Sequence, residues 1–149
     1  MSRWALLPLG LQALAMLVDE LHFHRRRGLP RWERIGHPLD TLTLLACYAV
    51  AIGWNPTPAA LATYAGLGVF SCLFVTKDEW VHARLATSGE HWLHALLFVA
   101  HPVVLAAIAW LWIDGEHTII WTQAGLTLAF GMYQAIYWQL PRSDPSPAR

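Results

Sequence analysis

Long apolar runs divided by short polar connections set the pattern of this chain. An α-helix needs about 20 mostly apolar residues to cross a bilayer, and several stretches reach or approach that length. The pattern predicts an all-α fold, an integral-membrane bundle of about five transmembrane helices. The predicted helices are Trp4–Arg26, Pro38–Trp54, Thr57–Arg84, Ser88–Ile113 and His117–Leu140.

The last predicted helix differs from the others because it contains no Asp, Glu, Lys or Arg. Small residues let membrane helices approach one another closely, and this stretch carries Gly125, Ala129, Gly131 and Ala135. We expect it to serve helix packing rather than chemistry.

The composition agrees with a membrane protein. Of the 149 residues, 56% are hydrophobic and 13% are charged, and that charged share is about half of what a soluble domain carries. Ten basic and ten acidic residues cancel, so we expect no nucleic acid among the partners. The length predicts a single transmembrane helical domain over residues 1–140, followed by a short polar C-terminal tail over residues 141–149.

Basic residues concentrate on one side of the expected bundle. The connection after the first helix is rich in arginine, the third connection contains Lys77 and Arg84, and the tail is also basic. Cytoplasmic segments of membrane proteins are enriched in Lys and Arg. We therefore expect a multi-pass protein with its N-terminus outside and its C-terminus in the cytoplasm. The arginines of the first connection are Arg25, Arg26, Arg27, Arg31 and Arg34.

Seven of the eight histidines fall on this same side, together with most of the carboxylates. They come from the ends of four predicted helices, and only His117 falls on the opposite side. Three carboxylate and histidine pairs stand four residues apart and so share a helix face. These pairs are Glu20 with His24, Asp78 with His82, and Glu90 with His94.

Imidazole and carboxylate groups near a membrane interior are costly unless they are paired or bind a ligand. Together they suit iron, manganese or zinc, and Glu79 with His82 has the Glu-x-x-His spacing of di-iron bundles. One metal ion uses three or four protein ligands, so the larger supply predicts two ions. The predicted ligands are Glu20, His24, Glu79, His82, Glu90, His91, His94 and His101. Alternates, or partners that orient the ligands, are His22, His37, Asp40, Asp19 and Asp78.

A simpler interpretation applies to these residues taken singly. Asp19, Glu20 and Asp78 lie near Arg25, Arg26, Arg27 or Lys77 in the sequence, and ordinary ion pairs at the membrane surface would account for each of them.

Two segments carry a resemblance. LHFHRRRGLPRWERIGHPLDTLT and FSCLFVTKDEWVHARLATSGEHWLHALLFVAHPV resemble a family of small bacterial integral-membrane proteins, which implies the bacterial inner (cytoplasmic) membrane but no activity. More loosely, the histidine clusters at helix ends resemble integral-membrane di-iron hydroxylases and desaturases, which use HxxxH and HxxHH boxes. The nearest matches here are His22-Phe23-His24 and His91-Trp92-Leu93-His94.

Three functions stay open. The first is a membrane-embedded di-metal oxidoreductase with two iron ions, similar to a non-haem di-iron hydroxylase. It would act with O₂ on a lipid or other apolar substrate at the cytoplasmic face, and it would need a separate electron donor. The second is a zinc-dependent membrane hydrolase, in which Glu79 or Glu90 acts as general base toward a zinc-bound water. The third is a non-catalytic metal- or haem-binding protein, in which His94 and His101 could ligate haem.

Overall fold

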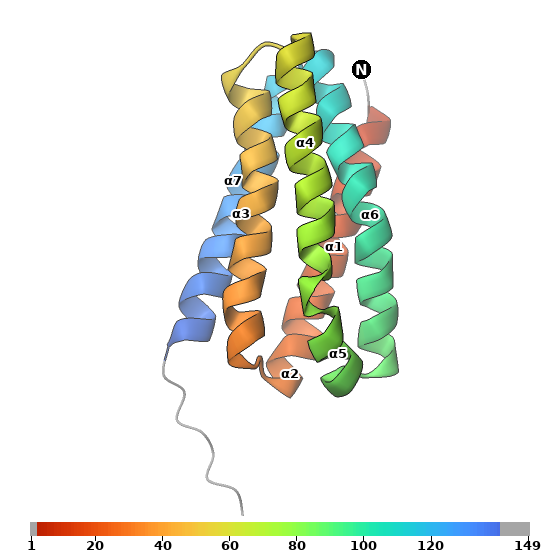
Figure 1. Ribbon diagram of the computed structural model, residues 1–149, viewed down its shortest axis with the longest axis vertical. Helices are drawn as coiled ribbons and strands as arrows, with labels where there is room; N and C mark the ends of the chain where they lie inside the picture. Colours follow the sequence, from red (N-terminus) through yellow and green to blue (C-terminus); the bar gives the residue numbers. More distant parts are fainter. Residues whose placement is uncertain (1–2, 141–149) are drawn as a thin grey trace, which may run out of the picture.

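The computed structural model describes residues 3–140, apart from the side chains of Arg3, Asp78 and Val81, and the predicted tail lies outside the described residues. The described part is helical throughout, which confirms the predicted all-α bundle (Figure 1). The five long rods of the bundle comprise η1 (Arg3–Ala5), α1 (Leu6–Val18), η2 (Asp19–His24) and α2 (Arg25–Arg27); α3 (Arg31–Gly53); α4 (Pro58–Phe74), η3 (Val75–Asp78) and α5 (Glu79–Leu85); α6 (Ser88–Ile113); and α7 (His117–Gln139).

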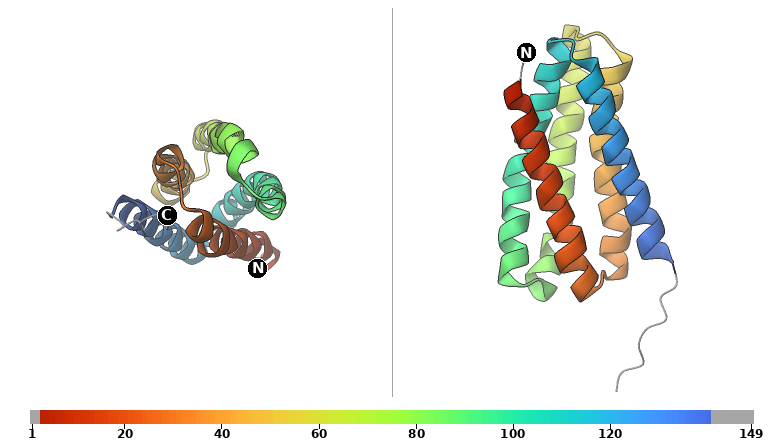
Figure 2. Two further views of the ribbon diagram at one scale, coloured as in Figure 1. Left: turned by 90° about the horizontal axis from the view of Figure 1, so that it is seen from below. Right: turned by 180° about the vertical axis from the view of Figure 1, so that it is seen from behind.

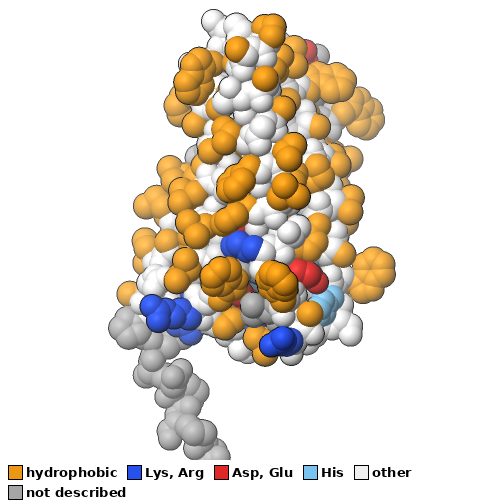
Figure 3. Space-filling view, viewed as in Figure 1, with side chains coloured by type: hydrophobic (Ala, Val, Ile, Leu, Met, Phe, Trp, Pro, Cys, Tyr) orange, Lys and Arg blue, Asp and Glu red, His pale blue; other side chains and the backbone are white. Residues whose placement is uncertain are grey.

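Four of the rods are long and apolar enough to cross a membrane: Leu6–Arg27, Arg31–Gly53, Pro58–Leu85 and Ser88–Ile113. Large hydrophobic side chains cover the outside of the bundle for most of its length, whereas basic side chains appear near the end that carries α2 and α5 (Figure 3). Such a surface fits a surrounding of lipid rather than water. The fifth rod, α7, lies alongside α3 (Figure 1 and Figure 2).

The second rod begins earlier than expected. The sequence predicted a helix from Pro38, but α3 begins at Arg31 and passes through Pro38. The prediction was wrong because it took Pro38 as the first residue of a helix, the position that proline favours, whereas this helix contains the proline in its interior. The turn before α3 is built at Gly28, whose φ of 76° lies in the left-handed region that glycine adopts easily. As a result Glu33 lies on a helix and not in a loop.

The bundle has two halves of different character. At the end away from α2 and α5, buried apolar side chains form the core, and they include Cys47, Ile108 and Ile120. Two polar groups in this half are satisfied internally: the Tyr64 hydroxyl donates to the Leu105 carbonyl at 2.7 Å, and the Trp112 indole donates to the Trp54 carbonyl at 2.9 Å. The buried ionisable residues lie in the other half.

The predicted close packing of the fifth helix holds at Gly131. A Cβ atom placed on Gly131 would lie 2.6 Å from Cγ2 of Thr41 on α3, whereas a Cβ atom on Gly125 would meet nothing within 4 Å. The absence of a side chain at Gly131 therefore sets how closely α7 approaches α3.

Substituting Gly131 tests this contact. Gly131→Ala should lower the free energy of unfolding by about 1–3 kcal/mol relative to Gly125→Ala, because overpacking forces the two helices apart. Both changes raise helix propensity by the same amount, so the difference isolates the clash with Thr41. Thermal unfolding in mild detergent, followed by circular dichroism, measures it. Equal midpoints for the two variants would contradict the close approach.

Candidate metal centre

Buried carboxylates and imidazoles from four segments meet in the half of the bundle that contains α2 and α5. All are less than 9% exposed. They are Asp19, Glu20 and His24 on η2, Glu33 on α3, His82 on α5, and Glu90 and His94 on α6.

The segment η2 is wound as a π-helix. A π-helix has more residues per turn than an α-helix, so neighbouring side chains are separated by a smaller angle. This winding explains why two adjacent acids, Asp19 and Glu20, are both buried together with His24. Short π-helical turns occur frequently at functional sites.

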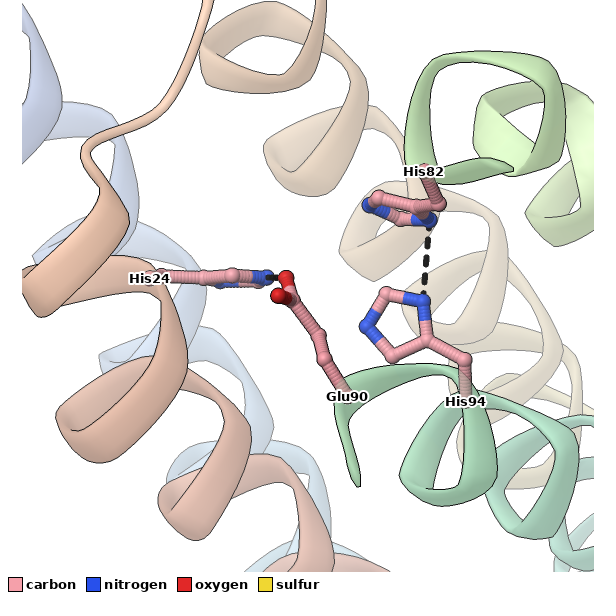
Figure 4. Close-up of side chains that lie close together, drawn as sticks. All are labelled: His24, His82, Glu90 and His94. Carbon is pink, nitrogen blue, oxygen red and sulfur yellow. Dashed lines mark hydrogen bonds and ion pairs between the residues drawn. The ribbon is translucent and has the colours of Figure 1, made fainter. Parts of the chain in front are cut away.

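One group of potential ligands consists of His24, His82, Glu90 and His94, which we call the outer group. Each residue offers one ligand atom, and these atoms lie within 4.8 Å of one another. Figure 4 shows the four side chains converging from three helical segments, with Nδ1 of His82 2.9 Å from Nδ1 of His94. Two nitrogens bound to one ion at about 2.0–2.1 Å are separated by about 2.9–3.4 Å in octahedral or tetrahedral geometry. The observed separation therefore suits a shared metal ion.

A second group consists of His24, Glu33, His37 and His82, again with ligand atoms within 4.8 Å of one another. We call it the inner group. It shares His24 and His82 with the outer group. The His82 ring faces both groups, because its Nδ1 lies toward His94 and its Nε2 lies 3.6 Å from Oε1 of Glu33. The two groups are therefore adjacent and overlap.

Three buried ring nitrogens of these groups have no hydrogen-bond partner among the described residues: Nε2 of His24, His37 and His82. Carboxylate oxygens approach two of them, at 3.2 Å from Asp19 to His24 and 3.6 Å from Glu33 to His82, but without hydrogen-bond geometry. More than about 90% of buried polar groups are hydrogen-bonded, so three exceptions in one place point to nitrogens that are available to a ligand.

Asp19 lies between two of the imidazoles. Its carboxylate oxygens are both 3.1 Å from Nε2 of His94, and Oδ2 is 3.2 Å from Nε2 of His24. A carboxylate in this position can orient the two rings or act as a further ligand.

Glu20 is held by the fifth rod. It accepts hydrogen bonds from Trp138 Nε1 at 2.8 Å, Gln134 Nε2 at 3.3 Å and the Tyr133 hydroxyl at 3.3 Å. Its Oε2 lies 3.5 Å from Nδ1 of His24. The sequence analysis expected only packing from this helix, yet its polar side chains fix the carboxylate that orients His24.

Arg27 joins the two groups from the outside. Its guanidinium donates to Glu33 at 2.7 Å and to Glu90 at 2.9 Å. Within the described residues, four buried carboxylates (Asp19, Glu20, Glu33 and Glu90) therefore face one partly buried guanidinium. With neutral histidines this leaves three negative charges in a low-dielectric region, which is costly without bound cations or protons.

The structure brings together only part of the predicted ligand set. Glu79 and His91 lie outside both groups, 3.8 Å from each other, with side chains 49% and 35% exposed. His22 is exposed and contacts Arg26. His91 follows Glu90 directly, and successive residues of an α-helix point about 100° apart. Only one of the two can therefore face the site.

The other predicted residues lie nearby in different roles. Asp40 accepts hydrogen bonds from Lys77 Nζ at 2.7 Å, and its Oδ2 lies 3.9 Å from Nδ1 of His37. His101 lies deeper and contacts Ser71 at 2.9 Å. The side chain of Asp78 lies outside the described part of the chain.

Glu33 is the buried carboxylate that the sequence analysis missed. It was assigned to a connection, although it stands four residues before His37. A helix predicted to begin at Arg31 would have placed Glu33 and His37 four residues apart on one helix face, like the other carboxylate and histidine pairs.

Comparisons of the chain with protein-family models, with curated proteins and with solved structures give no match. The chemistry of the centre therefore follows from its own geometry: two adjacent, buried sets of imidazole and carboxylate groups that could hold a metal ion.

Glu20 should matter without being a member of either group. Glu20→Gln removes the charge that orients His24, and losses of such orienting partners weaken metal affinity by about 10–100-fold. Titration of the metal-free protein with Co²⁺, followed by visible absorption, measures the affinity. Glu79→Gln is the matched control because Glu79 is a half-exposed carboxylate outside both groups. Equal affinities for the two variants would remove Glu20 from this role.

Proposed function

We propose that this protein is a membrane-embedded oxidoreductase that holds two iron ions in the outer and inner groups and acts with O₂ on an apolar substrate. The observation that carries the proposal is the overlap of the two four-residue groups through His24 and His82. Paired catalytic metals stand about 3.5–4 Å apart in proteins. A neutral imidazole offers one lone pair, so His24 and His82 could each serve either ion but not both at once.

The donor set is compatible with iron. Imidazole and carboxylate together suit iron, manganese and zinc, whereas thiolate would be expected for an iron–sulfur cluster. Neither group contains a cysteine. Two divalent cations would also offset the three unbalanced negative charges of the buried carboxylates.

The surroundings support an apolar substrate. A cavity of about 120 Å³ adjoins the centre, and its lining includes the apolar side chains of Met16, Leu44, Leu97, Phe98 and Phe130. We call it the inner cavity. Such walls would exclude water and admit an apolar molecule from the bilayer.

The reaction requires a partner. In hydroxylation with O₂, one oxygen atom enters a C–H bond, and the other leaves as water after uptake of two electrons and two protons. The electrons would come from a separate donor protein. The arginines near the centre favour a cytoplasmic position for that end of the bundle under the positive-inside rule, and the donor would approach it from that side.

A zinc-dependent hydrolase is the second candidate. It is favoured by the outer group taken alone, because its three imidazoles could hold one zinc ion and leave a fourth position for water, with Glu90 as the general base. Metal content separates the two candidates.

Metal analysis of protein purified in mild detergent tests the proposal. Wild type should carry about two irons per chain. His94→Ala removes a ligand from the outer group alone and His37→Ala from the inner group alone, so each should keep about one ion, whereas His82→Ala removes a residue that either ion could use and should keep no more than one. His117→Ala, at the opposite end of the bundle, is the control and should keep both.

Other outcomes would overturn parts of this assignment. One zinc per chain that is lost in His94→Ala but kept in His37→Ala would favour the hydrolase. Equal metal content in all four variants would show that neither group binds metal. Each variant should insert in the membrane and elute as wild type does.

A further inference from the structure

The inner cavity extends away from the metal centre toward a second polar pair. Its lining includes His24, His82 and His94 at one end and Gln12 and His101 at the other. Gln12 lies seven residues before Asp19, and His101 lies seven residues after His94. Seven residues of helix correspond to a rise of about 10 Å, so the two polar ends lie about two helical turns apart along the bundle.

A chain of hydrogen bonds fixes the orientation of this second pair. Thr43 Oγ1 donates to the Asp40 carbonyl at 2.8 Å, so the Ser71 hydroxyl, 2.7 Å from Thr43 Oγ1, must donate to it. His101 Nε2, 2.9 Å from Ser71 Oγ, must then be the donor to Ser71.

The remaining ring nitrogen completes the chain. A neutral imidazole has one donor and one acceptor nitrogen, so Nδ1 of His101 accepts from Gln12 Nε2 at 3.5 Å. The amide NH₂ of Gln12 is therefore directed at His101, and its oxygen is left over.

That oxygen, Gln12 Oε1, is buried and accepts no hydrogen bond from any described residue. Gln12 is 7% exposed and lines the inner cavity. A buried acceptor without a partner costs about 1–3 kcal/mol. A molecule in the cavity that brings a donor, such as a hydroxyl group, would recover this energy.

We propose that the inner cavity binds a neutral, unbranched aliphatic molecule whose terminal hydroxyl donates to Gln12 Oε1. The cavity volume of about 120 Å³ is several times the 10–15 Å³ that one water molecule needs. We choose an eight-carbon alcohol as the probe, because Gln12 and Asp19 are seven helical residues, or a rise of about 10 Å, apart. The far end of the chain would then lie at the metal centre.

This inference rests on the proposed function only for the reaction at the far end, because Gln12 and the cavity walls bind the molecule without metal. It names the substrate class of the same site as a medium-chain alcohol. The bulk of the contacts are apolar, and the hydroxyl supplies orientation.

Photolabelling of the full-length protein in lipid nanodiscs tests the proposal. The probes are a 1-octanol that carries a diazirine on its chain and the corresponding diazirine octane without the hydroxyl, each used with and without added Fe²⁺. The alcohol should label peptides of α1 and α6 that contain Met16 and Phe98, and excess 1-octanol should suppress the labelling. The octane probe should label these peptides about three- to tenfold less, which is the effect of one hydrogen bond.

The variant Gln12→Leu should reduce labelling by the alcohol to the level of the octane probe. Labelling by the octane probe should not change, which also shows that the variant is folded. Gln123→Leu is the matched control, because Gln123 lies on α7 outside the residues that line the cavity and should label as wild type does.

The two proposals can fail separately. Equal labelling by alcohol and octane in wild type, or unchanged alcohol labelling in Gln12→Leu, would overturn the inference even if two irons were bound. Specific alcohol labelling in a protein that binds no metal would uphold the cavity assignment and leave the oxidoreductase proposal without support.

Discussion

The rest of the structure depends on how four buried carboxylates are held at one end of a bundle that is otherwise apolar. Arg27 donates to Glu33 and Glu90 together, and so it joins the start of α3 to the start of α6. Glu20 is held instead by neutral donors from α7, and Asp19 lies against two imidazoles. A lone guanidinium cannot balance this charge in a low-dielectric region. The fold therefore requires cations or protons among its histidines, and metal binding would meet a need that the packing itself creates.

The two halves of the bundle have different roles, one in stability and the other in holding the ionisable groups. Buried apolar side chains such as Cys47, Ile108 and Leu111 pack together at one end of the bundle and hold its helices in place. These side chains need no hydrogen-bond or charge partner. The other half gives up this packing for ionisable groups, and it departs from regular α-helix at η2 and η3. The free energy gained by packing in the apolar half thus offsets the free-energy cost of burying charged groups in the other half. Functional regions often have lower local stability than the rest of a fold.

The helices and the side of the bundle that carries the histidines could be predicted from the sequence, because apolar length and the placement of ionisable residues are local signals. The start of α3 could not, because proline is common at a helix start and is also tolerated, at a cost, inside a helix, so Pro38 alone does not locate it. Glu33 was missed with it. The exposure of Glu79 and His91 depends on the rotation of α5 and α6 about their axes, which spacing alone leaves undetermined. The polar role of α7 follows from three-dimensional contacts to Glu20.

His101 shows how one residue type takes two roles in the same fold. It lies on the same stripe of α6 as Glu90 and His94, and its type and spacing predict a metal ligand. Two turns deeper, however, no carboxylate among the described residues lies within hydrogen-bond distance of its ring, and both ring nitrogens are engaged by Ser71 and Gln12. The hydrogen-bond chain that begins at the Asp40 carbonyl fixes its tautomer. An imidazole held in this way donates at one nitrogen and accepts at the other, so it can orient Gln12 but offers no lone pair to a metal. The stripe on α6 therefore contributes Glu90 and His94 to the metal centre and, two turns later, His101 to the end of the inner cavity that contains Gln12.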